Sequence, residues 1–159
     1  MDLEKPNKEK NKLKMCKEKI NSNYVLGFAF NEEETHIALI RKNKPEWQKG
    51  KLNGIGGKIE SEEIAYDAMI REFAEETGIF IYNWEKFGRI YENNENNNSF
   101  QVYLFKSFIS NVILNKLESK TEEIVSILPI KDIPYSVCIP NLSWLIPLAL
   151  HPYNIYMLI

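Results

Sequence analysis

Residues 50–79 read GKLNGIGGKIESEEIAYDAMIREFAEETGI, and this stretch decides the fold. Four of its first eight residues are glycine, which allows backbone conformations that other residues resist. We therefore expect a loop that approaches another group closely. Residues 62–77 contain neither Gly nor Pro, and Gly78 ends the run. This composition predicts a helix with Ser61 as its N-cap.

The predicted helix has one apolar face. Its large apolar residues recur at helical spacing and are expected to dock onto a sheet: Tyr66, Met69, Ile70 and Phe73. Two small residues, Ala65 and Ala68, are expected to leave open space beside the polar face.

The opposite face carries Glu72, Glu75 and Glu76 at positions i, i+3 and i+4, which lie about one turn apart. Each like-charged pair costs a few tenths of a kcal/mol, and Arg71 is the only basic residue close by on this helix. A divalent cation would offset the repulsion, because Mg²⁺ and Mn²⁺ prefer carboxylate oxygens. The cluster therefore predicts a metal site.

A solvated helix face is the alternative explanation for such a cluster. Against it, the glycine-rich loop leads directly into this helix. The wider spacing is Gly57, five residues, Glu63, seven residues, Arg71-Glu72-Phe73, one residue, Glu75-Glu76, one residue, Gly78-Ile79. This pattern resembles the Nudix box at every defined position.

The resemblance implies an α/β (α+β) fold, a Nudix-type α/β/α sandwich with a mixed central β-sheet and a loop-helix-loop catalytic motif. It also implies that Glu72, Glu75 and Glu76 bind Mg²⁺ or Mn²⁺, with the carbonyl of Gly56 as a backbone ligand. The metal would neutralise a diphosphate and lower the pKa of an attacking water.

Further roles follow from the same resemblance. Arg71 and Glu63 would orient the carboxylates, and Glu72 is the first choice to accept the proton. A distal carboxylate often completes the metal or base site in this family. Glu122 is assigned to the metal site on this basis, with Glu123 as the other candidate.

The substrate implied is a nucleotide, because residues 50–58 resemble the loop of MutT-type oxidised-purine nucleoside triphosphate diphosphatases. Asn53 would contact the purine base, and the remaining substrate-binding residues would be Gly56, Gly57, Lys58 and Asn141. In related sanitising enzymes a tryptophan stacks on the base and two aspartates read its edge. Here Ile139, Asn141 and Leu142 stand at those positions. Four residues offer other rings for stacking: Trp47, Phe28, Phe30 and Tyr103.

Three functions are compatible with these residues. The first is hydrolysis of a damaged or non-standard purine nucleoside triphosphate to the monophosphate and pyrophosphate. The second is the same chemistry on ADP-ribose, a dinucleoside polyphosphate or capped RNA. The third is a catalytically silent, nucleotide-sensing Nudix module, against which the complete carboxylate set argues.

Outside the motif, residues 1–22 are a lysine-rich arm or surface helix, and residues 23–159 are expected to form a single domain. Strands are predicted at residues 24–30 and 36–40, which are expected to form a hairpin, and at 86–92, 100–108 and 123–128. An asparagine-rich turn separates the third and fourth of these. A helix is predicted from about Asn141.

The composition is that of an ordinary globular protein, with 44% hydrophobic and 26% charged residues. A net charge of −2 gives no reason to expect nucleic acid as a partner. Cys16 and Cys138 are expected to be free thiols, and without a signal peptide the protein is expected in the cytoplasm. Prolines interrupt the apolar run 139–159, so no membrane span is expected. The protein would be a monomer or a homodimer.

Overall fold

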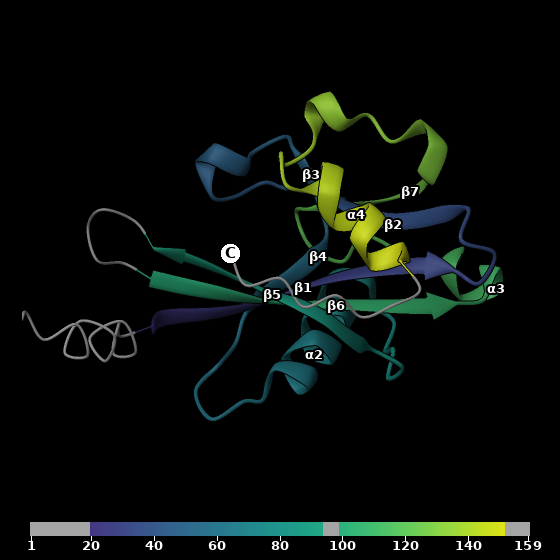
Figure 1. Cartoon of the computed structure of the whole chain (residues 1–159). Coiled ribbons are helices and arrows are strands. Elements are labelled where there is room, and N and C mark those ends of the chain that lie inside the picture. The colour runs from purple at the N-terminus through teal and green to yellow at the C-terminus, as the bar shows by residue number, and fades with distance from the viewer. Residues whose placement is uncertain (1–19, 94–98, 152–159) are drawn as a thin grey trace, which may run out of the picture.

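The computed structural model describes residues 20–93 and 99–151, and a mixed seven-stranded sheet forms its centre (Figure 1). The strands are β1 (Ile20–Asn31), β2 (His36–Arg41), β3 (Leu52–Asn53), β4 (Ile55–Lys58), β5 (Glu85–Asn93), β6 (Ser99–Ile109) and β7 (Ile124–Pro129). The α-helices are α2 (Ala65–Thr77), α3 (Asn111–Leu114) and α4 (Leu142–Leu150). Short 3-10 turns are η1 (Glu46–Gln48), η2 (Ile130–Asp132) and η3 (Tyr135–Val137).

The order β3-β2-β1-β6-β5 describes the main path of the sheet. β1 and β6 run parallel, and the remaining pairs are antiparallel. The edge of β1 away from β6 pairs with β4 at residues 24–27 and with β2 at residues 29–30. This split brings the glycine-rich strand β4 into the sheet beside the middle of β1.

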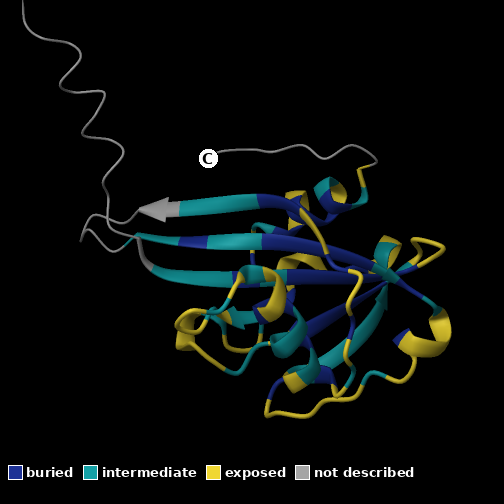
Figure 2. Cartoon of the chain, turned by 90° about the horizontal axis from the view of Figure 1, so that it is seen from below, coloured by how far each residue is buried: buried dark blue, intermediate teal, exposed yellow. Residues whose placement is uncertain are grey.

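Helices α2 and α4 cover opposite faces of the sheet (Figure 1). Alternate residues of β1 point to opposite faces, so Val25 and Ala29 pack on the α2 side while Phe28 and Phe30 pack on the α4 side. Figure 2 shows the buried residues concentrated on the central strands, with exposed loops around them. The predicted α/β/α sandwich with a mixed sheet is confirmed.

The apolar face of α2 differs in part from the prediction. Met69 and Phe73 are fully buried, as expected, but Tyr66 is substantially exposed. Ala68 is also fully buried in the core, so it leaves no open space beside the carboxylates, and that prediction is wrong. Because it has only a methyl group, Ala68 lets the helix approach the sheet closely.

The other predicted elements agree with the structure to within a few residues. The hairpin β1–β2, strands β5 to β7 and the last helix are all present, and α4 accommodates Pro147 within its length. Residues 20–22, assigned to the arm, belong to β1. Residues 1–19 with Cys16, most of the asparagine-rich turn and residues 152–159 lie outside the described residues. No helix in the described ranges combines the length and apolarity needed to cross a membrane.

Candidate active site

The glycine-rich strand β4 lies between β1 and the carboxylates of α2. A side chain at Gly56 would overlap the backbone carbonyl of Val25, and a side chain at Gly57 would overlap the carboxylate of Glu72. Glycine is therefore required at both positions by close approach. The expected close approach is confirmed, with the β1 backbone and Glu72 as the neighbouring groups. The loop prediction is wrong over most of its length, because residues 52–53 and 55–58 form strands β3 and β4.

Helix α2 begins later than its sequence indicates. Its N-cap residue is Ile64, and Ser61 lies in the turn before it, so the assignment of Ser61 as N-cap is wrong. The turn is closed because Glu63 N–H donates to the carbonyl of Glu60 at 3.2 Å and the Glu63 carboxylate accepts from Glu60 N–H at 2.9 Å. This turn leaves Glu63 facing the helix.

Arg71 joins the turn to the helix. Its Nε and Nη2 donate to the two oxygens of Glu63 at 2.8 and 2.9 Å, and Nη2 also donates to the carbonyl of Lys58 at 3.1 Å. Its Nη1 donates to Glu72 at 2.7 Å and approaches Glu75 at 3.4 Å. The hydrogen bond from Arg71 lowers the pKa of Glu63. Arg71 therefore holds both ends of the motif together, as the family resemblance implies.

The carboxylates that we predict as metal ligands occupy different environments. Burial raises the pKa of Glu72, with repulsion from Glu75 and Glu76 adding to it, and the hydrogen bond from Arg71 opposes the rise. Burial also raises the pKa of Glu76, with repulsion from Glu123 adding to it. Glu75 is more exposed, with 56% of its side chain accessible. Excess negative charge thus collects on this side of α2.

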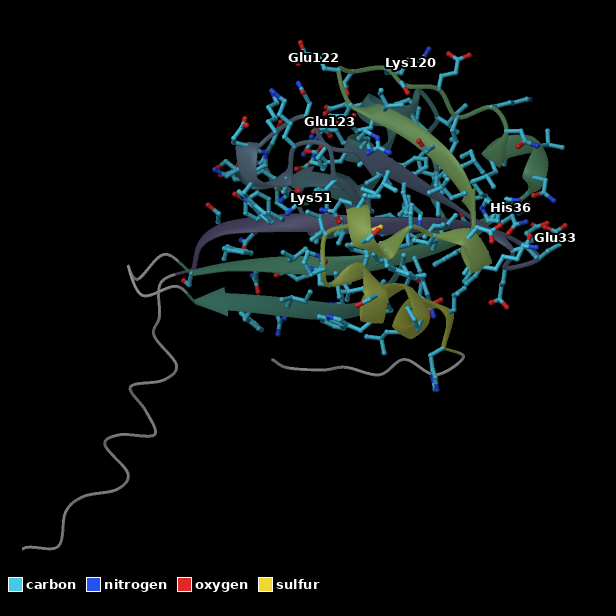
Figure 3. All side chains as sticks on the ribbon, turned by 90° about the horizontal axis from the view of Figure 1, so that it is seen from above. Glu33, His36, Lys51, Lys120, Glu122 and Glu123 are labelled. Atoms are coloured by element: carbon cyan, nitrogen blue, oxygen red, sulfur yellow. The ribbon has the colours of Figure 1, made fainter. Side chains whose placement is uncertain are left out.

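The distal glutamates are separated by the structure. Glu123 is 6% exposed and lies close enough to Glu76 to raise its pKa. Glu122 is exposed and accepts a hydrogen bond from the Asn43 side chain at 2.9 Å. Figure 3 shows Glu122 at the outer rim and Glu123 further inside. This arrangement favours Glu123 over our assigned Glu122 as the distal carboxylate.

The donor chemistry at this site suits a hard divalent cation. Five carboxylates lie around two cations, which leaves an excess of three negative charges. The carboxylates are those of Glu63, Glu72, Glu75, Glu76 and Glu123, and the cations are Arg71 and Lys42. The side chains are engaged with Arg71 and Thr121, and among the described residues no group of three or more potential ligands converges on one point. Oxygen donors and excess charge fit Mg²⁺ or Mn²⁺.

A cavity of about 400 Å³ adjoins the opposite side of the glycine-rich strand. Gly56 and Gly57 line it, and so do two predicted substrate-binding residues, Asn53 and Asn141. The Asn53 side chain accepts from Gly54 N–H at 2.8 Å and donates to Gln48 at 3.3 Å. The Asn141 amide oxygen is buried without a hydrogen-bond partner in the described structure. The predicted Lys58 side chain is exposed and is not among the lining residues.

Of the aromatic rings considered for base stacking, Trp47 lines the cavity and is 62% exposed. Phe28 and Phe30 are fully buried in the α4-side core, so those two suggestions are wrong. Tyr103 packs on the α2 side, with the Arg89 guanidinium 5.9 Å from its ring centroid, and does not line the cavity. Ile139 does line the cavity, at the position where the sanitising enzymes have tryptophan.

Sequence reasoning missed most residues of the cavity wall, among them Tyr24, Ile90, Phe100 and Val102. Tyr24 and Phe100 meet edge to face, with ring centroids 5.9 Å apart. They come together because β1 pairs in parallel with β6. The alternation of apolar residues along both strands was visible in the sequence, but the pairing was not.

A second, shallower depression of about 460 Å³ lies on the outer face of α2, lined by Asp67, Ile70, Arg71, Ala74, Glu75, Phe80 and Tyr82. Its aromatic residues, Phe80 and Tyr82, come from the segment that follows α2. None of the predicted substrate-binding residues lines this depression, whereas Asn53, Gly56, Gly57 and Asn141 line the cavity of about 400 Å³.

The sequence model of the NUDIX domain matches residues 22–143. No curated protein sequence is a significant match. Among solved structures, the NUDIX domain of Shewanella oneidensis NrtR complexed with ADP ribose has a TM-score of 0.68 at 16% identity, over 90% of this chain and 97% of that one.

Two MutT structures are also similar. The MutT protein from Methanosarcina mazei Go1 gives a TM-score of 0.64 at 18% identity, over 82% of this chain and 94% of that one. The MutT structure from a study of Aliivibrio salmonicida and Vibrio cholerae gives a TM-score of 0.57 at 21% identity, over 80% of this chain and 97% of that one. At these identities the structural likeness establishes the fold alone.

Proposed function

Because the chain belongs to the NUDIX family, we propose that it is a pyrophosphohydrolase that converts nucleoside triphosphates to the monophosphate and pyrophosphate. A damaged or non-standard purine nucleotide is the preferred substrate. The observation that carries this proposal is the cavity of about 400 Å³, which the backbone of Gly56 and Gly57 separates from the carboxylates of α2. A base in the cavity would place its phosphates near those carboxylates.

Nudix hydrolases generally need a divalent metal ion, and the residues that would hold Mg²⁺ or Mn²⁺ here are Glu72, Glu75 and Glu76, with the carbonyl of Gly56. When bound, the ion neutralises phosphate charge and activates water. Glu123, rather than Glu122, is the distal carboxylate beside this set, because it is the one that lies near Glu76. Its own carboxylate is held in an ion pair by Lys42.

The protein's own residues would then position the reactants. Arg71 holds Glu72 against β4, and Glu72 accepts the proton of the attacking water. The water adds to one phosphorus of the diphosphate bridge while the bridging P–O bond breaks and pyrophosphate leaves. Such positioning accounts for much of the rate that an enzyme gains.

Base recognition would come from polar groups in an apolar wall. The unpartnered Asn141 oxygen is an acceptor for an N–H on the edge of the base, and Asn53 offers amide atoms on the adjoining wall. Trp47, Tyr24 or Phe100 supplies the aromatic contact that Ile139 lacks. The free, buried Cys138 is consistent with a reducing compartment, and we propose a cytoplasmic location.

ADP-ribose is the second candidate, because the similar Shewanella domain was solved with that ligand. A product assay separates the two. Hydrolysis of a triphosphate should release inorganic phosphate only after inorganic pyrophosphatase is added. Faster turnover of ADP-ribose than of any nucleoside triphosphate would contradict the proposed substrate class.

A further inference from the structure

A lysine lies within the carboxylate cluster, on the side away from Arg71. The Lys42 ammonium is 2.7 Å from Glu123 Oε2, and only 16% and 7% of the two side chains are exposed. The other oxygen of Glu123 accepts the backbone N–H of Asn43 at 3.2 Å. Both oxygens of Glu123 are therefore occupied by residues that follow β2.

The same glutamate is linked to Glu76 through one hydroxyl group. Thr121 Oγ1 donates to Glu76 at 2.6 Å and accepts from the backbone N–H of Glu123 at 3.1 Å. Glu123 and Lys42 also shift the pKa of Glu76 in opposite directions. A change at Lys42 therefore reaches the predicted metal ligand Glu76 through a chain of direct contacts, and not only through the change in net charge.

Arg71 and Lys42 pair with different carboxylates of the cluster. Arg71 contacts Glu63, Glu72 and Glu75, whereas Lys42 contacts Glu123. Removing one member of a largely buried ion pair leaves the charge of the other uncompensated. Without Lys42, the Glu123 carboxylate would need another cation.

We propose that Lys42 is a positioning residue that acts as a resident cation: it keeps Glu123 out of the metal-ligand set and so limits how many divalent ions the cluster binds. This inference rests on the proposed function. Lys42 also lines the nucleotide cavity, so its charge lies where the cavity meets the cluster. Groups that surround metal ligands in this way commonly change metal affinity by about 10- to 100-fold.

The test is Mn²⁺ binding to the nucleotide-free full chain, followed by the electron paramagnetic resonance signal of free Mn²⁺. Lys42→Met should bind Mn²⁺ about tenfold more tightly or take up one additional ion. The double variant Lys42→Met/Glu123→Gln removes the pair without a change of net charge and should bind Mn²⁺ as the wild type does. Lys44→Met removes the same charge from an exposed neighbour and should leave binding unchanged.

Two results would overturn the proposal. One is equal Mn²⁺ binding by Lys42→Met and Lys44→Met. The other is a double variant about tenfold weaker than wild type, which would make Glu123 a ligand in the presence of Lys42. Circular dichroism checks folding, and Lys42→Gln replaces Lys42→Met should the latter not fold. Glu76→Gln tests the proposed ligand set separately: unchanged Mn²⁺ affinity in that variant contradicts the ligand set, whatever the Lys42 variants do.

Discussion

The carboxylate of Glu72 lies directly against the α-carbon of Gly57, with no space for a side chain between them. Arg71 holds the same carboxylate from the other side at 2.7 Å. Strand β4 and helix α2 therefore pack together through one carboxylate. Under the proposed function, this contact joins the cavity that would hold the base to the carboxylates that would hold the metal.

Substitution of Gly57 tests that junction. Gly57→Ala should displace Glu72 and lower kcat by about 100-fold, since small displacements of reacting groups have effects of this size. Gly88→Ala is the matched control, because its added methyl group meets only a leucine methyl at 3.3 Å. Steady-state kinetics with Mg²⁺ measure the effect, and equal kcat values for the two variants would show that the Glu72 contact is dispensable.

The Glu63–Arg71 pair predicts a pH-dependent contribution to stability. The pKa of Glu63 is lowered in the folded protein by Arg71, so the pair stabilises the fold above the unfolded-state pKa and loses this effect as pH falls through the folded-state pKa. Glu63→Gln should reduce the free energy of unfolding by about 1–2 kcal/mol at pH 7. The loss should shrink as the pH is lowered from 7 and vanish at an acidic pH below the folded-state pKa, at which both states are protonated.

Urea unfolding at the two pH values measures this difference. Glu62→Gln is the control, because Glu62 is an exposed neighbour in the same turn. A loss of stability in Glu63→Gln that is the same at both pH values would mean that packing, rather than the ion pair, stabilises the turn.

The buried oxygen of Asn141 predicts opposite effects on stability and activity. Asn141→Leu removes an acceptor that has no partner in the described structure, so the free protein should be as stable as wild type or more so. It should lower kcat/KM for the preferred nucleotide by about 10- to 100-fold. Asn141→Asp keeps the acceptor and should retain more activity than Asn141→Leu. Unchanged kcat/KM for every nucleotide in Asn141→Leu would remove Asn141 from the recognition site.

The catalytic helix could be predicted well because its signals are local. The spacing of Glu72, Glu75 and Glu76, and the stop at Gly78, follow from helical geometry within one segment. The start of the helix could not be predicted as well. Ser61 is a good capping residue, but the Glu63 side chain already closes the preceding turn and binds Arg71.

The cavity and the distal carboxylate depended on contacts that are remote in the sequence. Tyr24 and Phe100 are in contact because β1 pairs in parallel with β6. Lys42 forms an ion pair with Glu123, which lies 81 residues further along the chain. Neither local propensity nor periodicity encodes such pairing. The choice between Glu122 and Glu123 depended on which of these two side chains, just before β7, points toward Glu76. The tertiary structure determines this, and the local sequence does not.

The most direct test of the central claim compares Mg²⁺-dependent turnover of a nucleotide panel by wild type, Glu75→Gln and Glu76→Gln. Both variants should lose orders of magnitude in turnover. Because burial raises the pKa of Glu76, its ionised form destabilises the fold at neutral pH, and Glu76→Gln should unfold at the wild-type temperature or above. Full Mg²⁺-dependent activity in both variants would contradict the assignment of these carboxylates as metal ligands.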